Sequence, residues 1–156
     1  MINQVDFWPV NMELNMTAKQ VTDEFSVAEQ ITADDVDVLA AAGYKTIISN
    51  RPDGEAVGQP PVYEIQGASE DHGLVFRHIP VVSGQLSLQD IAAFTQALDE
   101  CPPPVLAFCR SGTRSIQLWG LAKGLKGMPP EDIVERGAAL GYDLRGVAGW
   151  LAQQQA

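Results

Sequence analysis

Apolar positions along the chain fall into two patterns, short runs bounded by turn residues and longer segments with helical spacing. The short runs predict strands at 24–27, 46–49, 74–79 and 105–108, and the last of these is predicted to be buried. The helical segments begin at or near Thr32, Gln59, Ser87, Arg114, Pro129 and Asp143. Because strands alternate with helices, this order predicts an α/β domain with a central, mostly parallel sheet, in which 105–108 is a central strand.

The length of the chain fits one domain. Its 156 residues are enough for one well-buried core and too few for two comfortable ones. We therefore expect a single domain over 1–156. Residues 1–19 scatter a few large apolar side chains among polar ones, so they are predicted to form an N-terminal arm that packs on the domain.

One predicted strand ends in a loop that is rich in glycine, hydroxyl and arginine side chains, CRSGTRS at 109–115. Consecutive backbone N–H groups in such a loop, with the free N–H groups of the following helix, converge on one point and bind anions. Arg110, Arg114 and the positive end of that helix favour the thiolate of Cys109 over the thiol. Gly112 is predicted to give the sharp turn and to let the backbone approach the ligand closely.

Cys109 has two interpretations. Free cysteine is among the most buried residue types, so a lone cysteine at the end of a strand is usually structural. Here the next six positions hold two arginines, a glycine and hydroxyl side chains. These neighbouring residues favour a functional role for the cysteine. A thiolate that faces a socket of N–H donors is suited to attack the centre of a tetrahedral oxyanion.

Composition excludes some classes of binding partner and indicates the cellular compartment. The formal net charge of −10 argues against nucleic acid or an anionic membrane surface as a partner. The two cysteines, Cys101 and Cys109, suggest neither a disulfide framework nor a zinc site. No run approaches the length of a transmembrane helix, and the N-terminus lacks the pattern of a secretory signal. We therefore expect a cytoplasmic protein that uses no metal or organic cofactor.

A second polar loop, NRPDGE at 50–55, follows the strand at 46–49. Loops that leave the ends of strands in an α/β sheet often carry site residues, so Arg51 and Asp53 are candidates for the pocket. Turn chemistry and a surface ion pair explain the same residues equally well.

The loop at 109–115 resembles two families that place a cysteine in an anion-binding loop. It closely resembles the active-site loop of rhodanese-type sulfurtransferases. The glycine three residues after the cysteine, and the Arg-Ser pair after the loop, also resemble protein tyrosine and dual-specificity phosphatases. The phosphatase pattern makes Ser115 a hydrogen-bond donor to the cysteine sulfur; a helix cap is the alternative.

Further segments extend the resemblance over roughly residues 20–145, namely 26–31 (SVAEQI), 45–54 (KTIISNRPDG) and 78–81 (HIPV). In this order they resemble the phosphatase-like domain that occurs as a stand-alone bacterial protein and as a fusion to metallo-β-lactamase-like hydrolases. The resemblance implies a tyrosine-phosphatase-like fold with a four- or five-stranded sheet flanked by helices. It leaves the reaction open between phosphatase and sulfur transfer.

The sequence departs from the phosphatase pattern in three ways. Four residues rather than five separate Cys109 from Arg114, Phe108 replaces the usual histidine, and the loop at 81–84 lacks the usual general-acid aspartate. Protonating the leaving group of a phosphate monoester is worth about 10²–10⁴ in rate, whereas sulfite leaves thiosulfate without a proton. Asp53 supplies the acid only if its loop folds over the cysteine.

The missing acid favours rhodanese-like sulfane-sulfur transfer through a Cys109 persulfide. The alternatives are hydrolysis of phosphate monoesters through phosphocysteine, and a non-catalytic anion-binding module. The expected substrate is a small anion, either thiosulfate or a persulfide, or a phosphate ester. The sequence assigns Cys109, Arg114 and Asp53 to catalysis, with Arg114 gripping the anion in bidentate fashion. It assigns to substrate binding Arg51, Arg110, Ser111, Gly112, Thr113 and Ser115.

Overall fold

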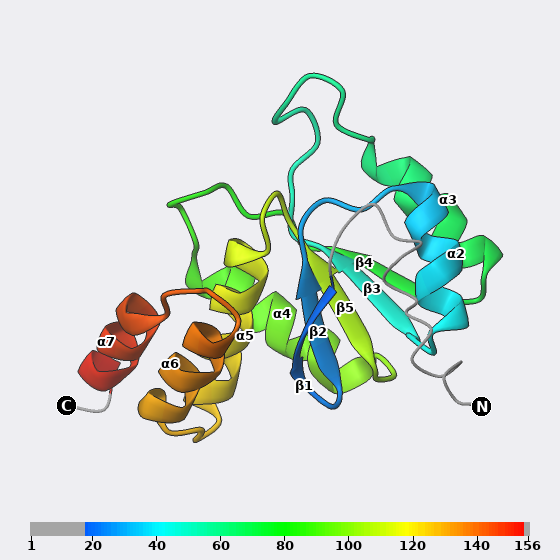
Figure 1. The fold of residues 1–156 in the computed structure, drawn as a ribbon. Helices are drawn as coiled ribbons and strands as arrows, with labels where there is room; N and C mark the ends of the chain where they lie inside the picture. The colour runs from blue at the N-terminus through cyan, green and yellow to red at the C-terminus, as the bar shows by residue number, and fades with distance from the viewer. Residues whose placement is uncertain (1–17, 155–156) are drawn as a thin grey trace.

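Four parallel strands and one antiparallel edge strand form the sheet of residues 18–154, the part of the chain that the computed structural model describes (Figure 1). The strands follow in the spatial order β1-β2-β5-β3-β4, and only the β1–β2 pair is antiparallel. The expected α/β class and the central place of the cysteine strand are confirmed. The strand bounds are β1 (Ala18–Thr22), β2 (Phe25–Ala28), β3 (Thr46–Ser49), β4 (Val75–His78) and β5 (Val105–Phe108).

Helices cover both faces of this sheet (Figure 1). On one face lie α2 and α3, whereas α4 and α5 cover the other face, with α6 and α7 packed outside α5. The side chains of β5 alternate accordingly: Leu106 and Phe108 pack in the α2–α3 core, and Val105 and Ala107 in the core beneath α4 and α5. The helix bounds are α2 (Ala33–Ala41), α3 (Val62–Asp71), α4 (Leu88–Glu100), α5 (Thr113–Leu125), α6 (Pro130–Ala139) and α7 (Arg145–Gln154).

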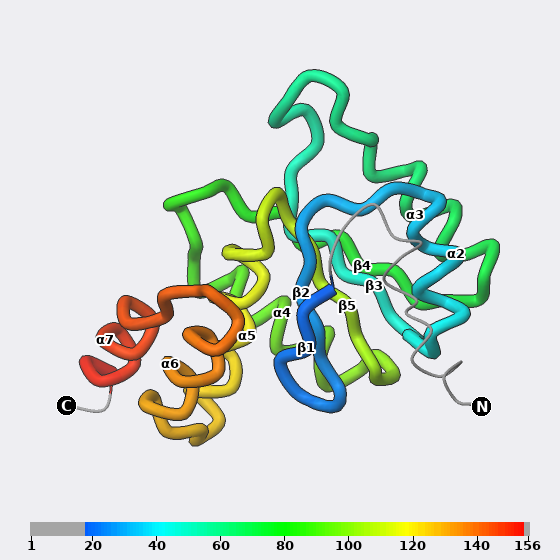
Figure 2. Tube along the Cα trace, viewed as in Figure 1, coloured from blue at the N-terminus to red at the C-terminus, as the bar shows by residue number. Residues whose placement is uncertain are grey.

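The loops that follow β2, β5 and β3 meet at the carboxyl edge of the sheet (Figure 2). Backbone hydrogen bonds join them: Asn50 N–H donates to Phe108 O at 2.8 Å, and Gln30 N–H donates to Arg110 O at 3.3 Å. Because parallel strands end at the same edge, residues far apart in sequence come together around the cysteine loop.

The N-terminal boundary differs from the expectation. Residues 1–17 of the predicted arm lie outside the described residues, but Ala18 and Lys19 belong to β1. This strand escapes a sequence pattern because it is a mostly polar edge strand, in which only Val21 is buried. It is held at the sheet edge by Arg136, whose guanidinium donates to Val21 O at 3.0 Å.

Candidate active site

Cys109 lies directly after β5, at the start of the segment that we call the anion loop (residues 109–115). The side chain is fully buried, and its sulfur accepts a hydrogen bond of 3.1 Å from Gly112 N–H. Gly112 is the N-cap of α5 and has a φ of 93°, in the left-handed region that favours glycine. The predicted turn at Gly112 therefore aims a backbone donor at the sulfur.

Tyr142, which precedes α7, braces the anion loop from outside. Its hydroxyl donates to Ser111 O at 2.9 Å. A Cβ added to Gly112 would lie 2.3 Å from the Tyr142 hydroxyl oxygen, so the loop closes only with glycine at this position. Burial raises the pKa of Tyr142, and its electrostatic interaction with Cys109 raises it further.

Arg114 lies in the first turn of α5 and is 7% exposed. Its two terminal nitrogens form a bidentate pair with Glu55, Nη1 to Oε2 at 2.7 Å and Nη2 to Oε1 at 3.0 Å, and Nη1 also donates to Val81 O at 2.8 Å. The bonds with Glu55 are the main cause of a raised Arg114 pKa, and Cys109 adds to it as a negative charge and as a hydrogen-bond acceptor. The structure thus brings the guanidinium and the sulfur together, as expected.

Glu55 joins Arg114 to a second arginine. It lies in the segment that we call the clamp loop (residues 50–61), where Arg51 Nε donates to Glu55 Oε1 at 3.0 Å and Arg51 Nη1 donates to Gln30 Oε1 at 3.0 Å. The Glu55 side chain is 25% exposed, and its pKa is held below the ordinary value of 4.5, chiefly by Arg114. Arg51 and Arg114 therefore share Glu55 Oε1, so Arg51 joins the ion-pair cluster of Arg114.

Asp53 and Ser115 are engaged elsewhere in this structure. Asp53 is exposed, and its carboxylate accepts a 2.8 Å bond from Val62 N–H at the start of α3, which is the turn chemistry considered above. The Ser115 hydroxyl donates to Asn50 Oδ1 at 2.8 Å in a buried contact. Since a hydroxyl has one proton to donate, Ser115 does not donate to the sulfur here, and the helix cap is Gly112.

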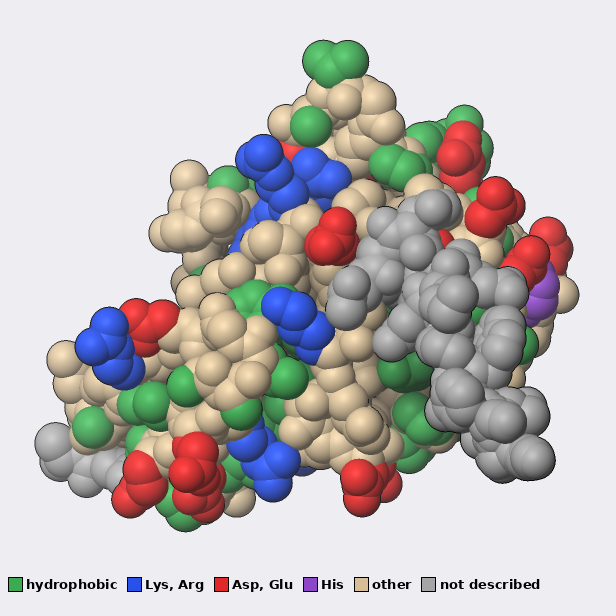
Figure 3. All heavy atoms as spheres, viewed as in Figure 1, with side chains coloured by type: hydrophobic (Ala, Val, Ile, Leu, Met, Phe, Trp, Pro, Cys, Tyr) green, Lys and Arg blue, Asp and Glu red, His purple; other side chains and the backbone are tan. Residues whose placement is uncertain are grey.

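A pocket of about 850 Å³ opens beside the anion loop. Arg110, Ser111 and Thr113 are exposed along it, and Figure 3 shows Lys and Arg side chains gathered at the base of the protruding loop. Cys109 is buried beside these residues and does not line the pocket. The remaining lining residues are Glu55, Val81, Ser83, Gly84, Leu86, Arg114 and Gln117.

Two further properties of residues 18–154 bear on metal and membrane binding. Within this range no three His, Cys, Asp or Glu side chains are grouped so that they could hold a metal ion. Over the same residues, none of the helices has the length and apolar character needed to cross a membrane.

Comparison with known proteins identifies the family. The model of the phosphatase-like domain of the beta-lactamase hydrolase-like protein matches residues 17–126. The chain belongs to this family. A beta-lactamase hydrolase-like protein of Agrobacterium fabrum is 36% identical over 142 residues, which are 90% of this chain and 33% of that protein. The phosphatase-like domain thus spans about a third of the length of its curated relatives.

Solved structures confirm the tyrosine/dual-specificity-phosphatase-like fold of the phosphatase-like domain. A proposed phosphatase of Neisseria meningitidis is 35% identical, with a TM-score of 0.75 over 85% of this chain and 94% of that one. The kinase-associated phosphatase has a TM-score of 0.69 over 88% of this chain and 92% of its own, at 13% identity. The matching family is phosphatase-like, and nothing in it supports the sulfur transfer that the sequence favoured.

Sequence reasoning missed Glu55, Tyr142 and Asn50 in the phosphatase-like domain. Each contacts the anion loop across a long sequence separation, 59 positions for Glu55 and Arg114. The sequence could have pointed to Glu55, because it is the second carboxylate of the loop that supplied the candidates Arg51 and Asp53. Nothing in the local sequence distinguishes Tyr142 from a core tyrosine.

Proposed function

We propose that the phosphatase-like domain hydrolyses phosphate monoesters through a phosphocysteine at Cys109. The observation that carries the proposal is the buried Cys109 sulfur that accepts a hydrogen bond from Gly112 N–H, with Arg114 in the first turn of the helix that follows, in a family and a fold of phosphatase-like proteins. Donors placed where oxyanion charge develops are commonly the largest contribution to such catalysis.

The chemistry divides into two displacements. The Cys109 thiolate attacks phosphorus, the S–P bond forms, and the P–O bond breaks. The leaving oxygen departs with the bonding electron pair and takes a proton from solvent water to become the alcohol. Water then attacks phosphorus, so that the S–P bond breaks and inorganic phosphate and the thiolate are released. In this proposal the bound oxyanion takes over the Gly112 N–H that now bonds to the sulfur, and it shares Arg114 with Glu55. The exposed Arg110, Ser111 and Thr113 contact the anion at the mouth of the loop.

One observation favours a second candidate, rhodanese-like sulfane-sulfur transfer. The carboxylate that lines the pocket, Glu55, has a lowered pKa because it is bound to Arg114, so it is a poor proton donor. An ester with a basic leaving group needs a proton, whereas sulfite does not. In that reaction Cys109 takes the outer sulfur of thiosulfate, forms a persulfide and releases sulfite. Asp53 acts as the missing acid only if it leaves Val62 and turns toward the sulfur.

A paired turnover assay separates these functions. Phosphate release from phenyl phosphate and sulfite release from thiosulfate are measured for the natural protein, Cys109→Ala and Cys101→Ala. Cys101 is the matched control, since it is the other buried free cysteine and lies at the end of α4. We expect phosphate release that Cys109→Ala abolishes and Cys101→Ala preserves.

The other outcomes of this assay are equally informative. Sulfite release, with a persulfide on Cys109 that cyanide removes as thiocyanate, would replace phosphatase by sulfur transfer. Inertness toward both compounds, with retained binding of inorganic phosphate, would leave a non-catalytic anion-binding module.

A further inference from the structure

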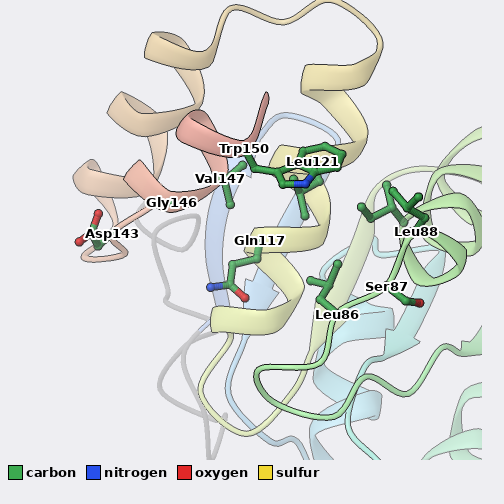
Figure 4. A pocket seen from close by; sticks show the side chains of 10 residues that line it. Leu86, Ser87, Leu88, Gln117, Leu121, Asp143, Gly146, Val147 and Trp150 are labelled. Atoms are coloured by element: carbon green, nitrogen blue, oxygen red, sulfur yellow. The ribbon is translucent and has the colours of Figure 1, made fainter. Parts of the chain in front are cut away.

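A second cavity lies beside the catalytic pocket, between α4, α5 and α7 (Figure 4). It measures about 330 Å³, within the range of sites for small organic ligands. Leu86 and Gln117 line both cavities, so the two share a wall. We call the second cavity the apolar groove, and its remaining lining residues are Ser87, Leu88, Ile91, Leu121, Asp143, Gly146, Val147 and Trp150.

The apolar groove extends along α5 away from the anion loop. Arg114, Gln117 and Leu121 follow at intervals of three and four residues, so they lie on one side of the helix. At a rise of about 1.5 Å per residue, the seven steps from Arg114 to Leu121 span about 10 Å along the helix axis. This is the length of a biphenyl group or a short acyl chain, reaching outward from a phosphoryl group at Arg114.

The chemistry of the apolar groove contrasts with that of the catalytic pocket. Buried Ile91, Leu121 and Val147 come from three different helices, while Leu88 is 68% exposed at the rim. None of the residues that line the apolar groove is a cation. Its one charged lining residue, Asp143, is paired with Arg145 at 2.8 Å. A second phosphate or an acidic peptide would meet no cationic side chain in the apolar groove. An apolar group would bind there because its surface is removed from water.

We propose that the apolar groove binds the apolar part of a bipartite substrate, a phosphate monoester whose alcohol carries an extended aryl or acyl group. This inference rests on the proposed function and adds its substrate class. The phosphoryl group lies at the anion loop, and the apolar group passes Leu86 and Gln117 to reach Leu121 and Val147. Polyphosphorylated sugars and acidic phosphopeptides are poor substrates on this account.

Binding of non-hydrolysable phosphonates to the full chain tests the apolar groove without relying on turnover. Calorimetry compares benzylphosphonate with its 4-phenylbenzyl analogue, and both with inorganic phosphate. We expect the extended probe to bind about tenfold more tightly than benzylphosphonate, because its outer ring is removed from water. Equal affinities of the two phosphonates would overturn the inference.

A charge placed at the rim gives a second measurement. Leu88→Glu puts a carboxylate beside the apolar groove, at the first residue of α4, where the helix dipole tolerates it. Tyr63→Glu is the matched control, since Tyr63 is 70% exposed and lies in the first turn of α3. We expect Leu88→Glu to reduce the tenfold preference to about twofold, and Tyr63→Glu to retain it. A preference that Leu88→Glu does not change would also contradict the inference.

The two proposals fail separately. If the extended phosphonate binds preferentially but no ester is hydrolysed, the apolar groove stands as a binding site and the phosphatase proposal is wrong. If phenyl phosphate is hydrolysed with dependence on Cys109 but the phosphonates bind alike, the phosphatase proposal stands and the apolar groove is wrong as a substrate site.

Discussion

The anion loop and the clamp loop contribute to the same site in different ways. In the anion loop, residues 109–115, the donor that meets the sulfur comes from Gly112, three positions away in the chain. In the clamp loop, residues 50–61, Glu55 holds a guanidinium from a residue 59 positions distant. The proposed nucleophile and its backbone donor are thus encoded in one contiguous motif, but the orientation of Arg114 depends on a contact with a distant loop.

Substitution of Arg114, where the two loops meet, is expected to have the largest effect on activity. Arg114→Lys keeps the charge and loses the planar fork that holds Glu55 and faces the sulfur. We expect kcat/KM for phenyl phosphate to fall about 10²–10³-fold, the usual loss for one oxyanion donor. Arg145→Lys, in an exposed ion pair, is the control. If Arg114→Lys lowers kcat/KM less than threefold, Arg114 does not stabilise the oxyanion and its proposed role is wrong.

Glu55→Gln tests the clamp loop alone. The amide keeps the size of the side chain but loses the charge that orients Arg114 and Arg51, so we expect kcat/KM to fall about 10- to 100-fold, as for a lost charge-assisted hydrogen bond. Asp53→Asn, in the same loop, should cost less. If Asp53→Asn costs more and removes the acidic dependence of the pH–rate profile, Asp53 rather than Glu55 is the functional carboxylate.

Ser115→Ala separates structure from catalysis within the anion loop. The change leaves the buried Asn50 Oδ1 without its 2.8 Å donor, so the free energy of unfolding should fall by about 1–3 kcal/mol. We expect kcat/KM to change less than in Glu55→Gln. The control for the free energy of unfolding is Ser111→Ala, which removes an exposed hydroxyl. A large loss of activity with unchanged denaturant stability would instead show that Ser115 acts on the sulfur.

The smallest effect is a pH dependence of stability. Since the folded protein holds the pKa of Glu55 below 4.5, the ion pair stabilises the fold above pH 4.5, and this contribution is lost as the pH falls through the lower folded value. At pH 7 the free energy of unfolding of the natural protein should be about 1 kcal/mol larger than that of Glu55→Gln. Denaturant titrations from pH 7 to pH 3 should show the difference vanish at the acidic end. A difference that persists there would contradict the pairing.

The limits of sequence reasoning follow the same division between local and distant contacts. Apolar runs such as 105–108, bounded by prolines and the anion loop, predicted four of the five strands and the α/β class. Three of these strands are fully buried, whereas β4 at the sheet edge is only half-buried to exposed, because no further strand covers it there. Cys109, Gly112 and Arg114 were found because seven consecutive residues carry the chemistry. The polar edge strand β1 was missed, since its pairing with β2 leaves only Val21 buried.

The choice between Asp53 and Glu55 shows what the local pattern lacks. Both carboxylates lie in the clamp loop, and no sequence rule states which one turns inward. In the structure Asp53 satisfies the N-terminus of α3, which leaves Glu55 to meet the arginines. Which carboxylate turns toward the arginines therefore depends on the three-dimensional course of the loop and not on its composition.

The central claim is a covalent phosphoryl group on Cys109, and rapid-quench mass spectrometry tests it most directly. The protein is mixed with excess phenyl phosphate, quenched in acid within milliseconds, and read as intact protein and as peptides. We predict a transient gain of one phosphoryl group on the peptide that contains Cys109, absent from Cys109→Ser. Phosphate release without any adduct on this cysteine, or an adduct elsewhere, would contradict the account.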